Sequence, residues 1–269
     1  MTRLDRRALF SSGAAAALLA ASGVSLDAAP RPGGRLRIAL PRSDDALATL
    51  ARGAAFDNLT EIAPNGALKG ELAIAWRAKA QGRIWNIDLR DDVTFHDGTA
   101  MRAPDVAASL RDTLDSALRV EACGPTRVRI EMAETRPDLP FLLASPALAI
   151  MGPDGVGTGC YRTERMVSDR HYLGQKVADH YKTRHAGWAD TVEAVVIPDA
   201  VVRAEALRDG YVDIAVIPRA DVLYGQPDLA FHPSSDSMAL AMRKTVGRPR
   251  DIGAGLLDDG RLAERWWLT

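Results

Sequence analysis

Residues 85–110 read WNIDLRDDVTFHDGTAMRAPDVAASL and place a strand, a turn and a helix start in direct succession. Apolar and polar residues alternate from residue 83 to residue 89, which predicts a strand with one buried face. The segment Phe95–Gly98 predicts a turn. Pro104 suits the first position of a helix, where its missing N–H group leaves no hydrogen bond unmade. The stretch therefore predicts one strand–turn–helix unit.

The turn in this stretch has two interpretations. His96 and Asp97 are adjacent, and such a pair can perform acid–base chemistry. In the other interpretation the turn is structural, since Asp97 can bond its own backbone and Gly98 permits a positive φ angle. No Gly-x-Ser-x-Gly elbow and no Cys/His pair at ligand spacing occurs elsewhere. We therefore expect no catalytic residue, no cofactor and no enzymatic activity.

Strands and helices alternate on both sides of this unit, which predicts an α/β fold. Apolar patterning predicts strands over residues 36–40, 127–132, 192–197 and 212–217, and helices over residues 44–56, 104–114, 139–148 in part and 201–208. Gly210 sits at the C-terminal cap of the last helix. The glycine-rich segment 152–159 lacks the Lys-Ser/Thr pair of a phosphate loop, so we interpret it as a crossover between domains.

Several short segments in order resemble one family. They are Leu72-Ala73-Ile74-Ala75-Trp76, Trp85 to Arg90, Val93 to Thr99, Ala103 to Val106 with Ser109-Leu110, Gly157-Thr158-Gly159-Cys160-Tyr161, and Ile197-Pro198-Asp199 through Ala215. Together they resemble the family 5 extracellular solute-binding proteins of ABC importers for dipeptides, oligopeptides and nickel. In the fifth segment Cys160 stands where the family has proline. The resemblance implies the structural role for the turn Phe95–Gly98, with Phe95 in the core, and we favour that role over acid–base chemistry.

The resemblance implies an α/β fold like lobe I of a type II periplasmic binding protein, with a smaller subdomain and with the second lobe largely absent. It implies lobe I over residues 30–240, an inserted subdomain at about 76–155, and a C-terminal remnant or helix over residues 241–269. Its functional implication is a periplasmic solute-binding component of a peptide or nickel importer. The alternative is a non-transport periplasmic accessory or interaction module derived from that lobe.

Residues 1–29 have the features of a signal peptide, with Arg6-Arg7 before a small, mildly apolar run. This arrangement favours twin-arginine export over an ordinary Sec signal and predicts a periplasmic protein. The 34 basic and 35 acidic residues nearly cancel, giving a formal net charge of −1. Such a balance excludes the basic surface expected of a nucleic-acid-binding protein. No later segment predicts a stable membrane insertion.

The sequence leaves the state of its two cysteines open, because a Cys123–Cys160 disulfide and two free thiols both fit an exported protein. His180 and His185 are five residues apart, off the spacing that puts two ligands on one helix face. We therefore expect solvated surface histidines and no metal site.

The expected partners are a peptide or another small solute, and an ABC permease or a periplasmic protein. From the topology we expect the ligand-binding residues at the cleft-facing ends of the strands and at the end of the first helix. The candidates are Arg42, Ser43, Asp44, Phe56, Pro218 and Arg219.

Overall fold

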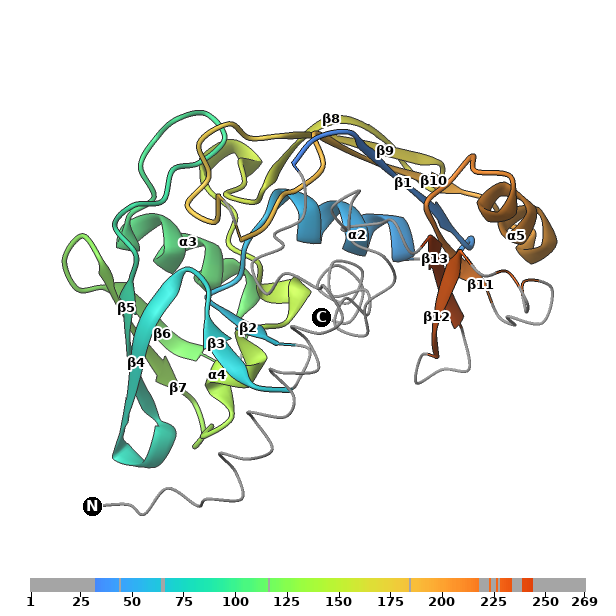
Figure 1. The fold of residues 1–269 in the computed structure, drawn as a ribbon. Helices are drawn as coiled ribbons and strands as arrows, with labels where there is room; N and C mark the ends of the chain where they lie inside the picture. The colour runs from blue at the N-terminus through green and yellow to red at the C-terminus, as the bar shows by residue number, and fades with distance from the viewer. Residues whose placement is uncertain are drawn as a thin grey trace, which may run out of the picture.

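A computed structural model describes residues 32–243, except residues 44, 64–65, 116, 184, 218–222, 224–225, 227 and 234–238. The predicted signal peptide and residues 244–269 of the predicted C-terminal remnant lie outside the described residues. Within them, two larger sheets and one short hairpin carry the fold (Figure 1).

The larger sheet has seven strands in the order β12-β13-β11-β1-β10-β9-β8. Their bounds are β1 Arg35–Leu40, β8 Tyr161–Val167, β9 His171–Lys176, β10 Thr191–Val196, β11 Ile214–Ile217, β12 Leu229–Pro233 and β13 Ala239–Arg243. The central strand β1 runs parallel to β10 and to β11, while the outer pairs are antiparallel. The carboxyl ends of the three parallel strands therefore meet at one edge of the sheet.

Two helices pack on opposite faces of this sheet. The amphipathic helix α2 (Ala46–Ala55) buries Leu47, Leu50 and Ala54 against the face that carries Ile38 and Leu40. On the other face, α5 (Ala200–Arg208) packs its apolar side chains against alternate positions of β1 and β11. The alternation of strand side chains between two faces thus produces two separate cores.

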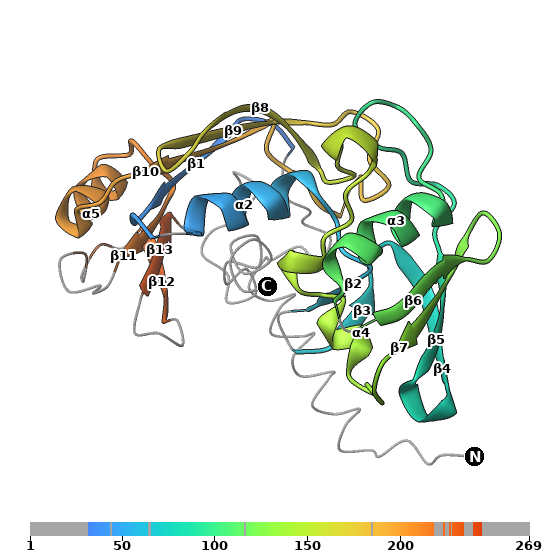
Figure 2. The same ribbon diagram turned by 180° about the vertical axis from the view of Figure 1, so that it is seen from behind.

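The smaller sheet has the order β4-β5-β7-β6 and is crossed by helix α3 (Ala103–Thr113), as Figure 2 shows. Its strands are β4 Ala73–Lys79, β5 Ile84–Leu89, β6 Ala117–Ala122 and β7 Arg127–Met132. The 3₁₀ turn η1 Ala80–Gly82 connects β4 to β5 at the tip of the smaller sheet. The segments that join the two sheets contain the hairpin β2 Thr60–Ile62 with β3 Leu68–Gly70, the short helix α4 Leu139–Leu142, and the 3₁₀ turns η2 Pro146–Leu148 and η3 Pro153–Gly155. The chain leaves the seven-stranded sheet after α2 and returns to it at β8.

The turn after β5 has the structural role predicted for it. Phe95 is 3% exposed, and Gly98 has a φ angle of +87°. The Asp97 carboxylate accepts a hydrogen bond from the Thr99 backbone N–H at 2.9 Å and another from its hydroxyl at 2.7 Å. The predicted positions of α3, β7, β10, α5 and β11 are confirmed to within three residues.

The β8–β9 hairpin was not predicted, because β8 lies at the edge of the sheet. Five of the seven residues of β8 are exposed, so its sequence lacks the alternation that identifies a half-buried strand. Strand β13 extends from residue 239 to residue 243 and so continues past residue 240, the predicted end of lobe I. The domain boundaries, including the insertion at about 76–155, stay a prediction.

The two cysteines are free thiols, which closes the alternative of a Cys123–Cys160 disulfide that the sequence left open. Cys123 is exposed in the turn between β6 and β7 of the smaller sheet. Cys160 is buried at the start of β8, in the core under α2. A disulfide needs Cβ atoms about 3.8 Å apart, and the two residues belong to different sheets.

Candidate functional site

An open pocket of about 70 Å³ lies where α2 ends. Its walls come from the last turns of α2, from the β2–β3 hairpin and from the segment joining α4 to η2. The lining residues are Thr49, Gly53, Phe56, Asp57, Asn58, Thr60, Glu61, Ile62, Glu71, Ala144, Pro146, Cys160, Lys182 and Ala186. The pocket therefore combines apolar walls with several polar and charged side chains, as small-molecule sites do.

Lys182 holds the polar side of this pocket together. Its Nζ atom lies 3.0 Å from Asp57 Oδ1 and forms a second, shorter ion pair with Glu71. All three side chains are at most 12% exposed. Buried carboxylates are stable as ions only when they are paired, so the lysine keeps both acids in place.

Glu71 also fixes the neighbouring backbone. Its Oε2 atom accepts a hydrogen bond from the Asn58 N–H at 2.9 Å. The Asn58 side-chain amide in turn donates to the carbonyl oxygens of Leu143 and Ser145 at 3.1 and 2.6 Å. The ion pairs and these hydrogen bonds tie three walls of the pocket to one another.

His180 lies on the inner side of Asp57. Its Nε2 atom is 2.7 Å from the Thr158 carbonyl oxygen and 3.5 Å from Asp57 Oδ2, and its side chain is 7% exposed. The Thr158 hydroxyl donates to Asp57 Oδ2 at 3.1 Å. The expectation of solvated histidines is therefore wrong for His180, which is part of a buried network.

Asp57 and Glu71 are both buried next to Lys182 but titrate in opposite directions. Burial alone raises the pKa of each acid. For Asp57 the charges and hydrogen bonds of Lys182 and His180 outweigh burial and lower the pKa. For Glu71 burial, aided by the charge of Asp57, outweighs Lys182 and raises the pKa to about 7. Glu71 is therefore the carboxylate of the pair that takes up a proton first.

Glu71→Gln is expected to remove a pH dependence of stability. A carboxyl group whose pKa rises on folding contributes stability that is full below its unfolded pKa of 4.5 and is lost as pH rises through about 7. Relative to the variant, the wild type should thus lose more than about 1 kcal/mol of unfolding free energy between pH 5 and 7.5. Urea denaturation at both pH values measures this, with the exposed Glu164→Gln as control. If the difference in unfolding free energy between wild type and Glu71→Gln is the same at both pH values, or changes with pH in the opposite direction, the raised pKa of Glu71 is wrong.

Two glycines let the crossover segment pass against the end of α2. A Cβ atom on Gly157 would lie 1.8 Å from the Ala55 carbonyl oxygen, and one on Gly159 would lie 2.5 Å from that of Ala54. The Gly159 N–H donates to the Ala55 carbonyl at 2.9 Å. This close approach places Thr158 and Cys160 beside Asp57 and explains why the segment alternates glycine with other residues.

The predicted ligand-binding residues are not all in one place. Phe56 lines the pocket at the end of α2. Arg42 and Ser43 are exposed at the carboxyl end of β1, before the start of α2. The ten residues of α2 separate the two positions by about 15 Å. Asp44, Pro218 and Arg219 lie outside the described residues.

Sequence reasoning missed the charged members of the pocket. Lys182 lies 125 residues from Asp57 and 111 from Glu71 along the chain, so no local pattern joins them. The one local signal was the replacement of proline by Cys160 in the Gly-Thr-Gly segment.

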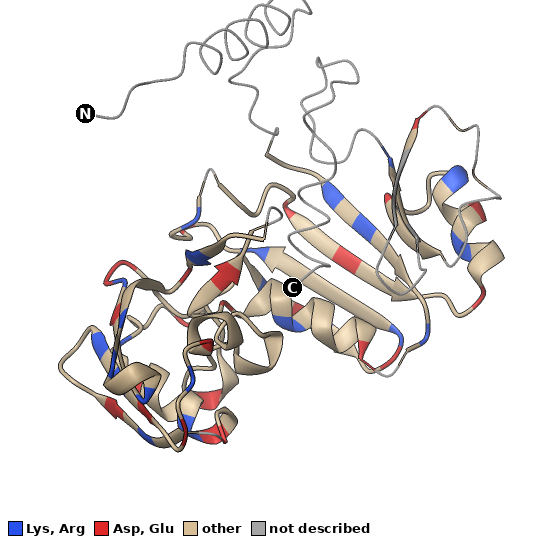
Figure 3. Cartoon of the chain, turned by 90° about the horizontal axis from the view of Figure 1, so that it is seen from below, with Lys and Arg blue, Asp and Glu red and all other residues tan. Residues whose placement is uncertain are grey.

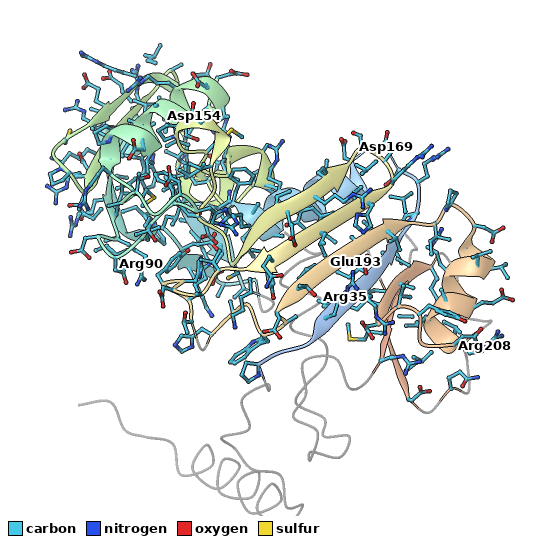
Figure 4. All side chains as sticks on the ribbon, turned by 90° about the horizontal axis from the view of Figure 1, so that it is seen from above. Arg35, Arg90, Asp154, Asp169, Glu193 and Arg208 are labelled. Atoms are coloured by element: carbon cyan, nitrogen blue, oxygen red, sulfur yellow. The ribbon has the colours of Figure 1, made fainter. Side chains whose placement is uncertain are left out.

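In the part of the chain that the structure describes, Lys and Arg positions are interspersed with Asp and Glu positions over both sheets (Figure 3). On the face of the large sheet turned away from α2, Arg35 of β1 pairs with Glu193 of β10 at 2.8 Å (Figure 4). Among the described residues, no helix is long and apolar enough to cross a membrane.

Comparison with known proteins identifies a family and a relative with similar sequences. The model of the bacterial extracellular solute-binding proteins, family 5 middle region, matches residues 67–245. The nickel-binding periplasmic protein of Escherichia coli (strain K12) is 25% identical over 198 residues, which are 61% of this chain and 36% of that protein.

Solved structures agree on the fold. The nickel ABC transporter structure from Bacillus halodurans aligns with a TM-score of 0.65 at 24% identity, over 74% of this chain and 46% of that one. The periplasmic binding protein DppA from Helicobacter pylori, in complex with the peptide STSA, aligns with a TM-score of 0.67 at 19% identity, over 75% and 51%. The chain spans about half the length of these proteins.

The fold is thus that of the type II periplasmic binding proteins, as predicted. The family model covers well over half of the chain and includes the smaller sheet, the crossover segment and the strands β8 to β13. The chain belongs to family 5 of the bacterial extracellular solute-binding proteins.

Proposed function

We propose that this chain is a solute-binding component of an ABC importer and that the pocket at the end of α2 holds one part of a bound peptide or nickel complex. The observation that carries the proposal is the open pocket itself, with its charged side chains fixed in place before any ligand arrives. Family membership supports a binding role rather than catalysis. The names of the relatives support peptides and nickel as the solute classes.

The ion pairs suit a polar solute because they are preorganised. Asp57, Glu71 and Lys182 are already oriented by one another, so a ligand does not have to order them on binding. Phe56 and Ile62 supply apolar contact on the same pocket. These polar and apolar groups together can recognise a peptide backbone through hydrogen bonds and peptide side chains through apolar contact.

The proposed location and partner follow from the family. A binding component of this type acts outside the cytoplasmic membrane and delivers its solute to a permease. We propose a periplasmic location and twin-arginine export on the strength of residues 1–29.

Calorimetric titration with a tetrapeptide and with nickel–histidine tests the proposal. Gly53→Leu is the matched blocking variant, because Gly53 lines the pocket and no atom lies within 4 Å of a Cβ placed there. We expect at least a tenfold loss of affinity for the solute that binds the wild type. Gly53→Leu should not lower the free energy of unfolding, because leucine in a helix is more favourable than glycine by up to about 1 kcal/mol.

Ala48→Leu is the control, since Ala48 is exposed on α2 but does not line the pocket. It should bind as the wild type does. The proposal is wrong if neither solute binds the wild type, or if Gly53→Leu binds with unchanged affinity.

A further inference from the structure

Cys160 and His180 lie at the edge of the same pocket and share Asp57 with the ion pairs of Lys182. The Sγ atom of Cys160 lies 3.5 Å from Nδ1 of His180. Cys160 is only 7% exposed, but it is one of the residues that line the pocket. A thiol next to an imidazole, in a residue that lines a pocket, is the arrangement of an activated nucleophile.

The ring of His180 is oriented to accept a proton from that thiol. Nε2 faces the Thr158 carbonyl oxygen at 2.7 Å, so Nε2 carries the hydrogen and Nδ1 is the acceptor. Asp57 Oδ2 lies 3.5 Å from Nε2 and stabilises the ring once it is charged. Nucleophile, base and orienting carboxylate thus follow one another as in hydrolytic triads.

The surroundings of His180 favour its charged form. Burial lowers the pKa of His180, but hydrogen bonds to Asp57 and Cys160 outweigh burial and raise it to about 9. Nδ1 also accepts a hydrogen bond from the Lys182 backbone N–H at 3.1 Å, so this N–H and the thiol share the lone pair of that atom. The titratable groups that face the pair are Asp57, Glu71, His96, Tyr161, Lys176, Tyr181 and Lys182.

We propose that Cys160 is a modification site: a reactive thiol, deprotonated by His180, that forms a mixed disulfide with a small-molecule disulfide entering the pocket. Cys160 Sγ attacks one sulfur of the small disulfide, and the S–S bond of that molecule breaks. The departing thiolate takes the proton held on His180 Nδ1. One disulfide is exchanged for another, so the step requires no separate oxidant.

The chain contains its own control. Cys123 is exposed in the turn between β6 and β7, and within the described residues no hydrogen bond to a base is found for it. Accessibility alone would make Cys123 the more reactive thiol. Activation by His180 predicts the opposite order near neutral pH.

The test uses Cys123→Ser and Cys160→Ser, which leave one thiol each, and iodoacetamide as the probe between pH 6.5 and pH 9. The reaction of a thiol with no base beside it speeds up by about 80-fold over this range as the thiolate fraction rises, and Cys123 supplies the comparison. Cys160 should change by less than about fivefold. Intact-mass spectrometry gives both rates on the folded protein. Cystine at pH 6.5 should then modify Cys160 at least tenfold faster than Cys123.

His180→Gln removes the proton acceptor and should give Cys160 the steep pH profile of Cys123. If that variant does not fold, the pH profile of the unaltered site still decides the matter. Parallel profiles for the two cysteines, or no reaction of Cys160 in the folded protein, would overturn the proposal. Neither result bears on solute binding, which the Gly53→Leu experiment tests separately.

Discussion

Lys182→Met is expected to lower the free energy of unfolding by about 4 kcal/mol, because it leaves two buried carboxylates without their shared cation. Asp57 and Glu71 are both nearly excluded from solvent, and Lys182 contacts both. Methionine matches the length of the lysine side chain, so the loss reflects charge rather than a cavity. Urea denaturation at pH 7.5 measures the effect.

Lys69→Met is the matched control, since Lys69 is exposed on β3 of the neighbouring hairpin. Its effect should stay within about 0.5 kcal/mol. Adding Glu71→Gln to Lys182→Met should recover at least about 1 kcal/mol, because only one carboxylate is then left to be buried. A loss under about 1 kcal/mol for Lys182→Met alone would show that solvent reaches the pair.

The penalty of Lys182→Met should also shrink as the pH falls. Without the lysine, burial raises the carboxyl pKa values further, and protonation then removes the buried charge. Below pH 5 the difference in unfolding free energy between Lys182→Met and the wild type should be smaller than at pH 7.5. A penalty independent of pH would instead point to lost packing of the lysine side chain.

Much of the fold could be predicted because its decisive segments are local. The alternation over residues 84–89 and 127–132 identifies two neighbouring strands of one sheet. Phe95, Asp97 and Gly98 specify their turn by side-chain chemistry within five residues. The edge strands β6 and β8 were not predicted, because half or more of the residues in each strand are exposed and these exposed residues show no regular apolar pattern.

The site could not be predicted in the same way. Phe56 was expected at the cleft from the topology, and it lines the pocket; that it binds a ligand stays a prediction. Its charged neighbours meet only when the crossover segment and the β9–β10 connection fold back on α2. Arg42 and Ser43 were expected at the cleft from the same topology; they lie at the end of α2 opposite to the pocket, and their role in ligand binding stays a prediction.

Arg203→Met is expected to destabilise the large sheet by about 4 kcal/mol, since it leaves three backbone carbonyl groups without their donor. Arg203 of α5 is 2% exposed. Its guanidinium donates to the carbonyl oxygens of Ile197, Pro198 and Val216 at 2.6, 2.9 and 2.5 Å. Burial lowers the pKa of Arg203, but an arginine stays protonated at every pH compatible with folding.

These bonds join the carboxyl ends of β10 and β11, the two strands that flank β1. Arg203→Lys should restore only part of the stability, because an ammonium group cannot serve three carbonyls at the fixed angles of a guanidinium. Arg208→Met, at the exposed end of the same helix, is the control and should change stability by less than about 0.5 kcal/mol. Hydrogen exchange should show faster exchange of β11 amides in Arg203→Met, with β5 and β7 unchanged. Equal exchange in both sheets would mean that Arg203 supports the whole molecule rather than the edge beside β1.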